Sequence, residues 1–392
     1  MKTRFATALA AIALLFGLAG CGGGGGGGIE GTGAPLGTMR LAVTDAPSCG
    51  FDAVHITIDR VRVHQSGDAV DADAGWSEVV LNPAKRVDLL TLSNGVLEPL
   101  GQTDLPAGKY TQMRLVLAPN TTANPLANSV TPTGGAETAL TTPSGQQSGL
   151  KINVDIDIPV GKVADFAIDF DACKSIVKRG NSGQYNLKPV VSVTPIVSDA
   201  GMRVVGYVDP AIAVGSTVVS LQFNGVPVKT TAPDTTGRFV LYPVPVGTYD
   251  LVVRAAGRVT ATMTGVPVVT TAPTSVNSAA LAILPGTTTL RAVSGTVAPA
   301  VATARSLQIY TGGPTVEVAW ANVDVNSGVF GFALPIGAPV KRAYVANPTT
   351  LVFVPDAAVA AKYSIEAASN GILKSQAIDT GAAVPPLVFS FP

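Results

Sequence analysis

Apolar and polar residues alternate along much of this chain, with the period of two that is typical of β-strands. The alternating segments are residues 39–43, 109–117, 150–158, 162–169 and 185–193. They are separated by segments rich in Gly, Pro, Asn and Ser, which favour turns. Only residues 88–92 suggest a helical turn. The pattern therefore predicts an all-β chain.

One predicted strand changes its parity. Val54, Ile56 and Ile58 occupy even positions, whereas Val61 and Val63 occupy odd ones. A regular strand cannot direct both groups to one face, because successive side chains point to opposite faces. We therefore predict a β-bulge at residues 59–60.

The N-terminus has the pattern of an export signal. Lys2 and Arg4 precede an apolar run at 5–19, which is shorter than the roughly 20 residues that a spanning helix needs. Leu18-Ala19-Gly20-Cys21 resembles the lipobox of bacterial lipoproteins. The resemblance implies that Cys21 carries acyl chains and anchors the chain in a membrane.

Residues 22–28 are all glycine. Glycine has no side chain to pack, so we expect a flexible tether. Gly22 stands where, by resemblance, an acidic residue would indicate retention in the inner membrane. The outer membrane is therefore the expected location, with the protein facing the periplasm or the medium.

Composition supports the β prediction and limits the partners. Gly (42 residues) and Pro (29) are frequent, and only 13% of residues are charged. Lys plus Arg and Asp plus Glu number 26 each, so no net positive field would attract nucleic acid. We expect no nucleic-acid partner and no cofactor.

Three cysteines are present. With Cys21 acylated, Cys49 and Cys173 remain, and exported proteins fold in an oxidising compartment. A Cys49–Cys173 disulfide is the simplest prediction, and two free buried thiols are the alternative.

The first β-rich segment resembles a bacterial family of exported proteins, domain-of-unknown-function family 4382, over residues 36–198. The resemblance lies in Thr44-Asp45-Ala46-Pro47, Leu105-Pro-Ala-Gly-Lys-Tyr110 with Arg114, Pro143-Ser-Gly145 before Gly149-Leu-Lys151, Asp169-Phe-Asp171-Ala with Ser175, and Tyr185-Asn-Leu-Lys-Pro189. It implies a β-rich exported domain with no established chemistry. No catalytic residue is implied.

Residues 202–285 resemble the carboxypeptidase-regulatory-like, prealbumin-type β-sandwich, through Arg238–Tyr249 and the strand that follows. In this pattern Tyr249 is expected to be a core residue whose hydroxyl bonds nearby backbone. Several short motifs recur about 90 residues later, such as Gly206 as Gly295 and Pro245 as Pro335. Residues 288–392 are therefore predicted to be a second, divergent copy, which departs from the first after Gly337.

Candidate catalytic groups are few. His55 and His64 are the only histidines and lie on one predicted strand, where surface positions explain them. Ser175 and Lys178 fit the Ser-x-x-Lys pattern of penicillin-binding enzymes, but the partner motifs of those enzymes are absent. An enzyme is therefore not expected.

Acidic residues suggest one weak metal site. Asp71, Asp73 and Glu78 surround Gly75 and could supply oxygen ligands to calcium, although their spacing does not match an EF-hand. An acidic hairpin loop is the simpler interpretation. Asp169 and Asp171 would be candidate ligands only if the fold brought them near Asp45.

Carbohydrate binding needs exposed aromatic rings. Aromatic residues are 6% of the chain, with two tryptophans, Trp76 and Trp320. Trp320 shares strand parity with Val316 and Val318, which predicts that it lies in the core. A carbohydrate role then depends on fold analogy with starch-binding-like sandwiches.

Together these patterns predict a lipoprotein signal peptide (residues 1–20), an acylated Cys21 with a glycine-rich tether (21–35) and three β domains. The three β domains, at 36–198, 202–285 and 288–392, are expected to be β-sandwiches of the Ig-like or prealbumin-like class. They are expected to follow one another in a row along the chain. The expected function is that of an outer-membrane-anchored, non-enzymatic structural or interaction protein of the adhesion type. Glycans or envelope proteins are the expected partners, and a carbohydrate-binding surface protein is the alternative.

Overall fold

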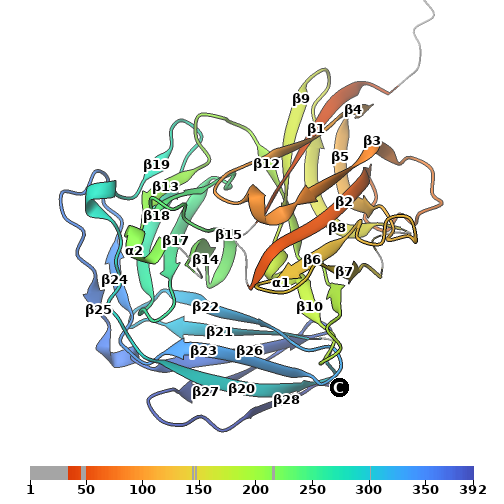
Figure 1. The fold of residues 1–392 in the computed structure, drawn as a ribbon. Helices are drawn as coiled ribbons and strands as arrows, with labels where there is room; N and C mark the ends of the chain where they lie inside the picture. Colours follow the sequence, from red (N-terminus) through yellow and green to blue (C-terminus); the bar gives the residue numbers. More distant parts are fainter. Residues whose placement is uncertain (1–33, 46–49, 144, 146–147, 214–216, 301) are drawn as a thin grey trace, which may run out of the picture. The chain divides into compact units, whose positions relative to one another are not determined.

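The computed structural model describes residues 34–45, 50–143, 145, 148–213, 217–300 and 302–392. Cys21, the tether and Cys49 lie outside these residues. From Pro35 to Pro392 the chain forms one compact unit, built almost entirely of β-strands (Figure 1). This confirms the all-β, multi-sandwich prediction. In this part of the chain no helix is long and apolar enough to cross a membrane.

The first module is a sandwich of two sheets that enclose one apolar core. The smaller sheet has the order β12–β9–β1–β4, with β1 (Leu36–Asp45), β4 (Glu98–Pro106), β9 (Val163–Phe170) and β12 (Val191–Ile196). The larger sheet has the order β10–β11–β7–β6–β2–β5–β8, with β3 paired to β2. Its strands are β2 (Phe51–His64), β3 (Ser77–Asp88), β5 (Gly108–Leu117), β6 (Ser129–Pro132), β7 (Thr138–Thr141), β8 (Leu150–Ile158), β10 (Ile176–Lys178) and β11 (Tyr185–Leu187).

Strand β2 contains the predicted bulge. Its pairing with both β3 and β5 shifts register between Ile58 and Arg60. The shift lets Val54, Ile56, Ile58, Val61 and Val63 all reach the same core, where each is fully buried. The helical turn expected at 88–92 is the 3-10 turn η1 (Leu89–Leu92), which Asp88 caps through Leu90 N.

The segment predicted as one strand at 185–193 is two strands in different sheets. β11 ends at Leu187 and β12 begins at Val191. Pro189, between them, has no N–H to donate to a ladder. The flanking amides bond Ser175 instead: Lys188 N donates to its carbonyl and Val190 N to its hydroxyl, both at 2.8 Å. The chain therefore leaves one sheet and enters the other here.

The second and third modules have the same topology, as the sequence repeat predicts. In each, a three-stranded sheet (β16–β13–β19 or β23–β20–β28) accompanies a four-stranded ladder (β15–β14–β17–β18 or β22–β21–β26–β27). The second module contains β13 (Val204–Tyr207), β14 (Val218–Phe223), β15 (Val226–Thr231), β16 (Arg238–Leu241), β17 (Gly247–Arg254), β18 (Ala261–Val268) and β19 (Thr274–Ser275). The third contains β20 (Leu290–Ala298), β21 (Thr303–Ile309), β22 (Thr315–Asn322), β23 (Val329–Pro335), β26 (Lys362–Ser369), β27 (Ile372–Asp379) and β28 (Leu387–Ser390).

The largest difference between the two copies is an insertion that begins where the sequence similarity ends. Between β23 and β26, strands β24 (Val340–Ala343) and β25 (Val354–Pro355) leave the third module and extend the ladder of the second. β24 pairs in parallel with β18, with Ala261 opposite Val340 at one end and Thr264 opposite Ala343 at the other. A single division of the chain at 285–288 therefore does not fully separate the two modules, because strands β24 and β25, within residues 340–355, pair with the second module.

A buried tyrosine links strand and turn in each module. Tyr110 donates its hydroxyl hydrogen bond to Pro106 O at 2.8 Å, and Tyr249 donates to Pro245 O at 2.9 Å. The prediction for Tyr249 is thus confirmed. In the third module the insertion separates the pair in sequence, yet Tyr363 still donates to the equivalent proline carbonyl, at 2.6 Å.

We expect Tyr363→Phe to reduce the free energy of unfolding by about 1–2 kcal/mol, because the carbonyl of the half-buried Pro335 loses this donor. Urea denaturation of the full-length chain measures this change. Tyr344→Phe is the matched control, since the Tyr344 hydroxyl has no hydrogen bond within the described residues. An equal loss in both variants would contradict a specific role for the hydroxyl of Tyr363.

Candidate functional site

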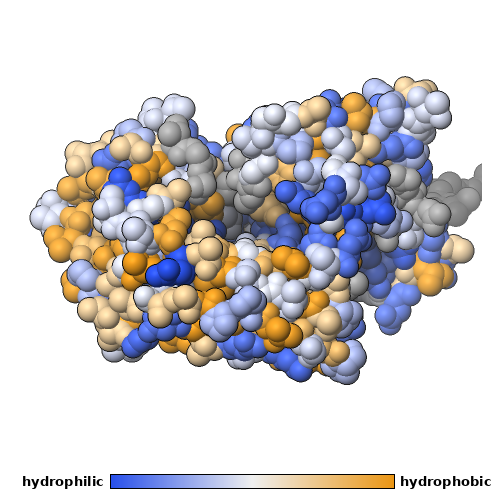
Figure 2. Space-filling model, turned by 60° about the horizontal axis from the view of Figure 1, so that its bottom comes forward, coloured by the Kyte–Doolittle hydropathy of each residue, from blue (hydrophilic) through white to orange (hydrophobic). Residues whose placement is uncertain are grey.

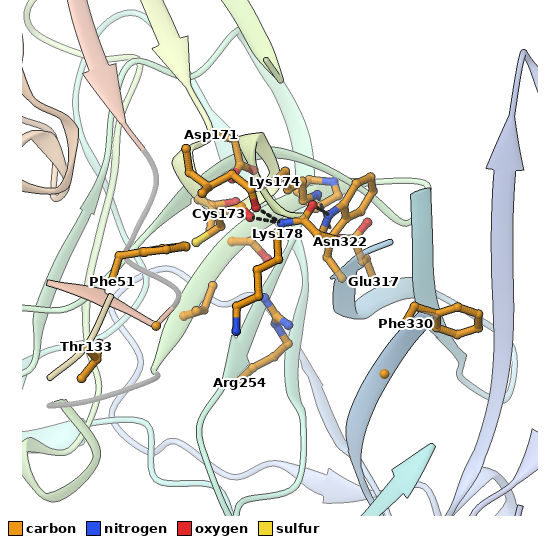
Figure 3. A pocket seen from close by; sticks show the side chains of 18 of the residues that line it. Phe51, Thr133, Asp171, Cys173, Lys174, Lys178, Arg254, Glu317, Asn322 and Phe330 are labelled. Carbon is orange, nitrogen blue, oxygen red and sulfur yellow. Dashed lines mark hydrogen bonds and ion pairs between the residues drawn. The ribbon is translucent and has the colours of Figure 1, made fainter. Parts of the chain in front are cut away.

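A cleft with a volume of about 1000 Å³ is lined by all three modules (Figure 3). We call it the junction cleft. The first module contributes the start of β2, α1 (Ala172–Ser175) and β10. The second contributes β14, β15 and β17, and the third contributes β22 and β23. A second cleft of about 280 Å³ shares part of this lining, including Lys174, Glu317 and Trp320.

A buried ion pair lies between the two clefts. Lys174 Nζ of α1 is 2.9 Å from Glu317 Oε1 of β22, and their side chains are 14% and 4% exposed. The ammonium also lies 4.4 Å from the centre of the Trp320 ring, a cation–π arrangement. The pair therefore joins the first module to the third.

Glu317 is also connected to the second module. Gln222 Nε2 of β14 donates to Glu317 O at 2.9 Å, and Glu317 N donates to Gln222 Oε1 at 2.7 Å. This two-bond amide–backbone contact is fully buried. One residue thus contacts both other modules.

Further polar contacts connect the first module directly to the third. Asn322 Nδ2 donates to the carbonyls of Cys173 (2.9 Å) and Ile176 (2.7 Å), which supplies partners at the C-terminal end of α1. Gly180 N donates to Asp324 Oδ2 at 2.6 Å. The modules are therefore not successive beads that contact only their neighbours in sequence.

The first and second modules have their own contacts. Lys229 Nζ is 2.7 Å from Asp169 Oδ1, with side chains 2% and 15% exposed. Asn94 N donates to Thr231 Oγ1, and Asn94 Oδ1 accepts from Val240 N. These contacts fix the β15 side of the junction.

Arg254 and Lys178 are the basic groups of the junction cleft without an ion pair among the described residues. Arg254 Nη1 donates to Val318 O at 2.7 Å, but its buried Nε has no acceptor. Burial lowers the pKa of Arg254, opposed by the charges of Glu317 and Asp171. Lys178 is exposed at the end of β10, and its side chain extends into the same cleft (Figure 3).

Asp171 caps α1 and lines the cleft. Its Oδ1 accepts from Lys174 N at 3.0 Å. Burial raises the pKa of Asp171 to about 6, and the nearby Lys174 charge only partly offsets this. Asp171 thus changes charge in a mildly acidic range, unlike an ordinary exposed aspartate.

The predicted calcium ligands have other partners. Asp71 and Glu78 both form ion pairs with Arg62, which stacks 4.6 Å from the Trp76 ring centre. Asp73 Oδ2 accepts from Val70 N at 2.9 Å within the loop. No group of three or more metal-binding side chains is found in the described ranges. Calcium would have to displace Arg62.

The other candidates from sequence lie in structural positions. His64 bonds the backbone of Ser66 and Ala74, and His55 Nδ1 is 3.7 Å from Glu137 Oε1. Burial is the main cause of the lowered pKa of His55. Ser175 is buried, with its hydroxyl accepting from Val190 N, so it does not act with Lys178.

The fold does bring Asp45 near the acidic pair. β1 and β9 are parallel neighbours that place Thr44 beside Asp169 and Asp45 beside Phe170. However, Asp45 Oδ1 accepts from Ala172 N at 2.9 Å, and Asp169 pairs with Lys229. These carboxylates hold α1 and β15 in place.

Cys173 lines the junction cleft. Cys49 lies outside the described residues, so the Cys49–Cys173 pairing stays a prediction. The anchor residue Cys21 likewise lies outside them.

The prediction that Trp320 lies in the core is wrong. The pairing of β22 with β21 shifts register between Ser306 and Leu307, where Ala319 and Glu317 are their partners. This bulge leaves Val316 and Val318 in the core and turns Trp320 to the cleft. The sequence interpretation also missed Glu317 and Arg254. A lone acidic residue between two core valines was the available signal for Glu317.

We expect Asp171→Asn to stabilise the fold at neutral pH. The pKa of Asp171 is about 6 in the folded state and 3.8 for the ordinary side chain. The folded state therefore loses stability as the pH rises from 3.8 to about 6, because the buried carboxyl must ionise. The neutral amide avoids this cost and can still cap α1. The expected gain at pH 7.5 is on the order of 1–3 kcal/mol, and it should vanish towards pH 4.

Urea denaturation at several pH values measures this difference. Asp324→Asn is the control with the opposite sign, because hydrogen bonds from Ser327 and Asn326 lower the pKa of Asp324 although burial opposes them. A pH-independent effect of Asp171→Asn would contradict the assignment.

Two solved structures to which the chain is similar show low TM-scores. An N-terminal interface mutant of a type II cohesin–X-dockerin complex from Acetivibrio cellulolyticus is 23% identical, over 22% of this chain and 59% of that chain, with a TM-score of 0.19. A streptococcal ancillary pilin is 9% identical, over 90% of this chain and 98% of that chain, with a TM-score of 0.17. At these TM-scores the likenesses carry no argument.

No curated protein matches the chain in sequence. A family model does match the first module, which confirms the family resemblance predicted from sequence. The match ends before residue 198, the predicted end of the domain. Residues 36–189 match the family described as domain of unknown function (DUF4382).

Proposed function

We propose that this chain is a structural or interaction protein of the bacterial envelope, which displays three joined β modules from a lipid anchor at the outer membrane. The supporting observation is the way the modules are joined. Glu317 contacts both other modules through buried, charged or paired polar groups. Such contacts favour one arrangement of the modules, which a display or adhesion protein needs to present a defined surface.

The use of the reactive side chains supports a non-enzymatic role. His64 and Ser175 bond nearby backbone, and the carboxylates of Asp169 and Glu317 pair with lysines. The surface agrees with a protein-binding or scaffold role. Figure 2 shows apolar and hydrophilic side chains mixed across the face it presents. Envelope proteins or glycans are the partners we propose.

The anchor part of the proposal is based on the resemblance of residues 18–21 to a lipobox. The second and third modules are proposed to be carboxypeptidase-regulatory-like sandwiches. Their shared topology supports a repeated module, and the resemblance of 238–249 supplies the family.

Cys21→Ala should abolish lipidation, because the thiol that would carry the diacylglycerol is removed. The measurement is incorporation of labelled palmitate during expression of the full-length chain, together with fractionation of the membranes. Cys49→Ala is the matched control and should keep the label. Labelled palmitate on the Cys21 variant would refute the anchor.

We also propose that Cys173 is bonded to Cys49. Such a bond would tie the segment after β1 to α1 within the first module. In the chain-entropy model, closing a loop of this length stabilises the fold by roughly 4–5 kcal/mol.

Mass spectrometry of the unreduced chain should therefore find one cross-linked peptide that contains Cys49 and Cys173. The reduced chain is the control and should give the two peptides separately. Two alkylatable thiols before reduction would refute the pairing.

Carbohydrate binding is the second candidate. The junction cleft favours it, because Trp320 lies on its wall beside polar groups rather than in the core. The Trp320 face that Lys174 covers is not free to stack on a sugar. A neutral saccharide is therefore one of the probes used below.

A further inference from the structure

The four carboxylates that line the junction cleft have partners within the protein. Glu317 forms an ion pair with Lys174, Asp324 accepts a hydrogen bond from Gly180 N, and Asp171 accepts one from Lys174 N. Asp52, also on the wall, accepts from Gly134 N at 3.1 Å. Each of these four carboxylates therefore already has a donor or cation within the protein.

The donor groups differ. Lys178 forms no ion pair with any described residue, and Arg254 uses Nη1 on Val318 O while its buried Nε has no acceptor. Figure 3 shows both side chains extending into the cleft, one from the first module and one from the second. Leaving a buried guanidinium N–H without an acceptor is costly. The cleft thus offers cationic donors.

We propose that the junction cleft binds a small ligand through an oxyanion, such as a carboxylate, sulfate or phosphate group, placed between Lys178 and Arg254. A guanidinium presents parallel N–H donors that match two oxygens of such a group, and an ammonium adds charge. Because the two cations belong to different modules, the ligand would also connect those modules.

The surrounding charges set the conditions for binding. Glu317 and Asp171 are the carboxylates whose charges act on Arg254. Glu317 pairs with Lys174, so the carboxylates that oppose an incoming anion are Asp171, Asp52 and Asp324 on the cleft wall. Burial raises the pKa of Asp171 to about 6, so below that pH the charge of Asp171, the carboxylate that acts directly on Arg254 besides Glu317, is removed.

The size of the cleft indicates more than a free ion. About 1000 Å³ is at the upper end of the range for small-molecule sites. Phe51 and Trp320, both half-buried, line it and could pack against the apolar part of a ligand. The proposal does not depend on the lipid anchor.

Isothermal titration calorimetry of the full-length chain in detergent tests the proposal, with sodium sulfate as the probe, constant ionic strength and a pH of about 5.5. Sulfate keeps its charge in this range. We expect saturable binding that Lys178→Gln weakens about tenfold, because a charge-assisted contact is lost. Lys178 is exposed, so the variant should fold. Lys162→Gln is the matched control at another exposed lysine and should bind like the wild type.

Absence of saturable sulfate binding would overturn the proposal, as would equal affinity in the Lys178 and Lys162 variants. Maltotriose serves as the neutral saccharide. Saturable maltotriose binding without sulfate binding would overturn the oxyanion site in favour of the carbohydrate candidate. None of these results would bear on palmitate labelling, so failure here and failure of the anchor are distinguishable.

Discussion

The ion pair between Lys174 and Glu317 is the interaction on which the arrangement of the three modules depends. It lies where α1 of the first module meets β22 of the third, and Gln222 of the second bonds the backbone of the same glutamate. Two charges removed from water need each other and further hydrogen bonds to offset their desolvation. Separating the modules would leave Lys174 and Glu317 without each other as partners. The ion pair therefore opposes independent movement of the first and third modules.

The junction cleft follows from that arrangement. Strands β24 and β25 add to the restraint, because the third module supplies them to the ladder of the second. The cleft walls therefore come from three modules that are held at several points. A ligand bound between Lys178 and Arg254 would connect the first and second modules across the same cleft.

The first module matches a family of unknown function over residues 36–189. Within this module, the polar residues Asp45, Asp169, Asp171 and Ser175 are bonded around α1 and β15. Asp45, Asp171 and Ser175 form hydrogen bonds within the first module, around α1, whereas Asp169 binds Lys229 of the second module.

Much of the local structure could be predicted from sequence. The strands, the β2 bulge, the turn at 88–92, the buried Tyr249 and the repeated module all follow from alternation, parity and recurring motifs. These features are set by short-range rules of the backbone, which any segment of the sequence carries with it.

The junction was decided by tertiary structure alone. A bulge in β22 sends Trp320 to the cleft, and Pro189 lets the chain change sheets. Glu317, Lys174 and Gln222 meet although they are far apart in sequence. Alternation reports which residues share a strand face, but not which face another module covers. That choice depends on long-range packing, for which no local pattern exists.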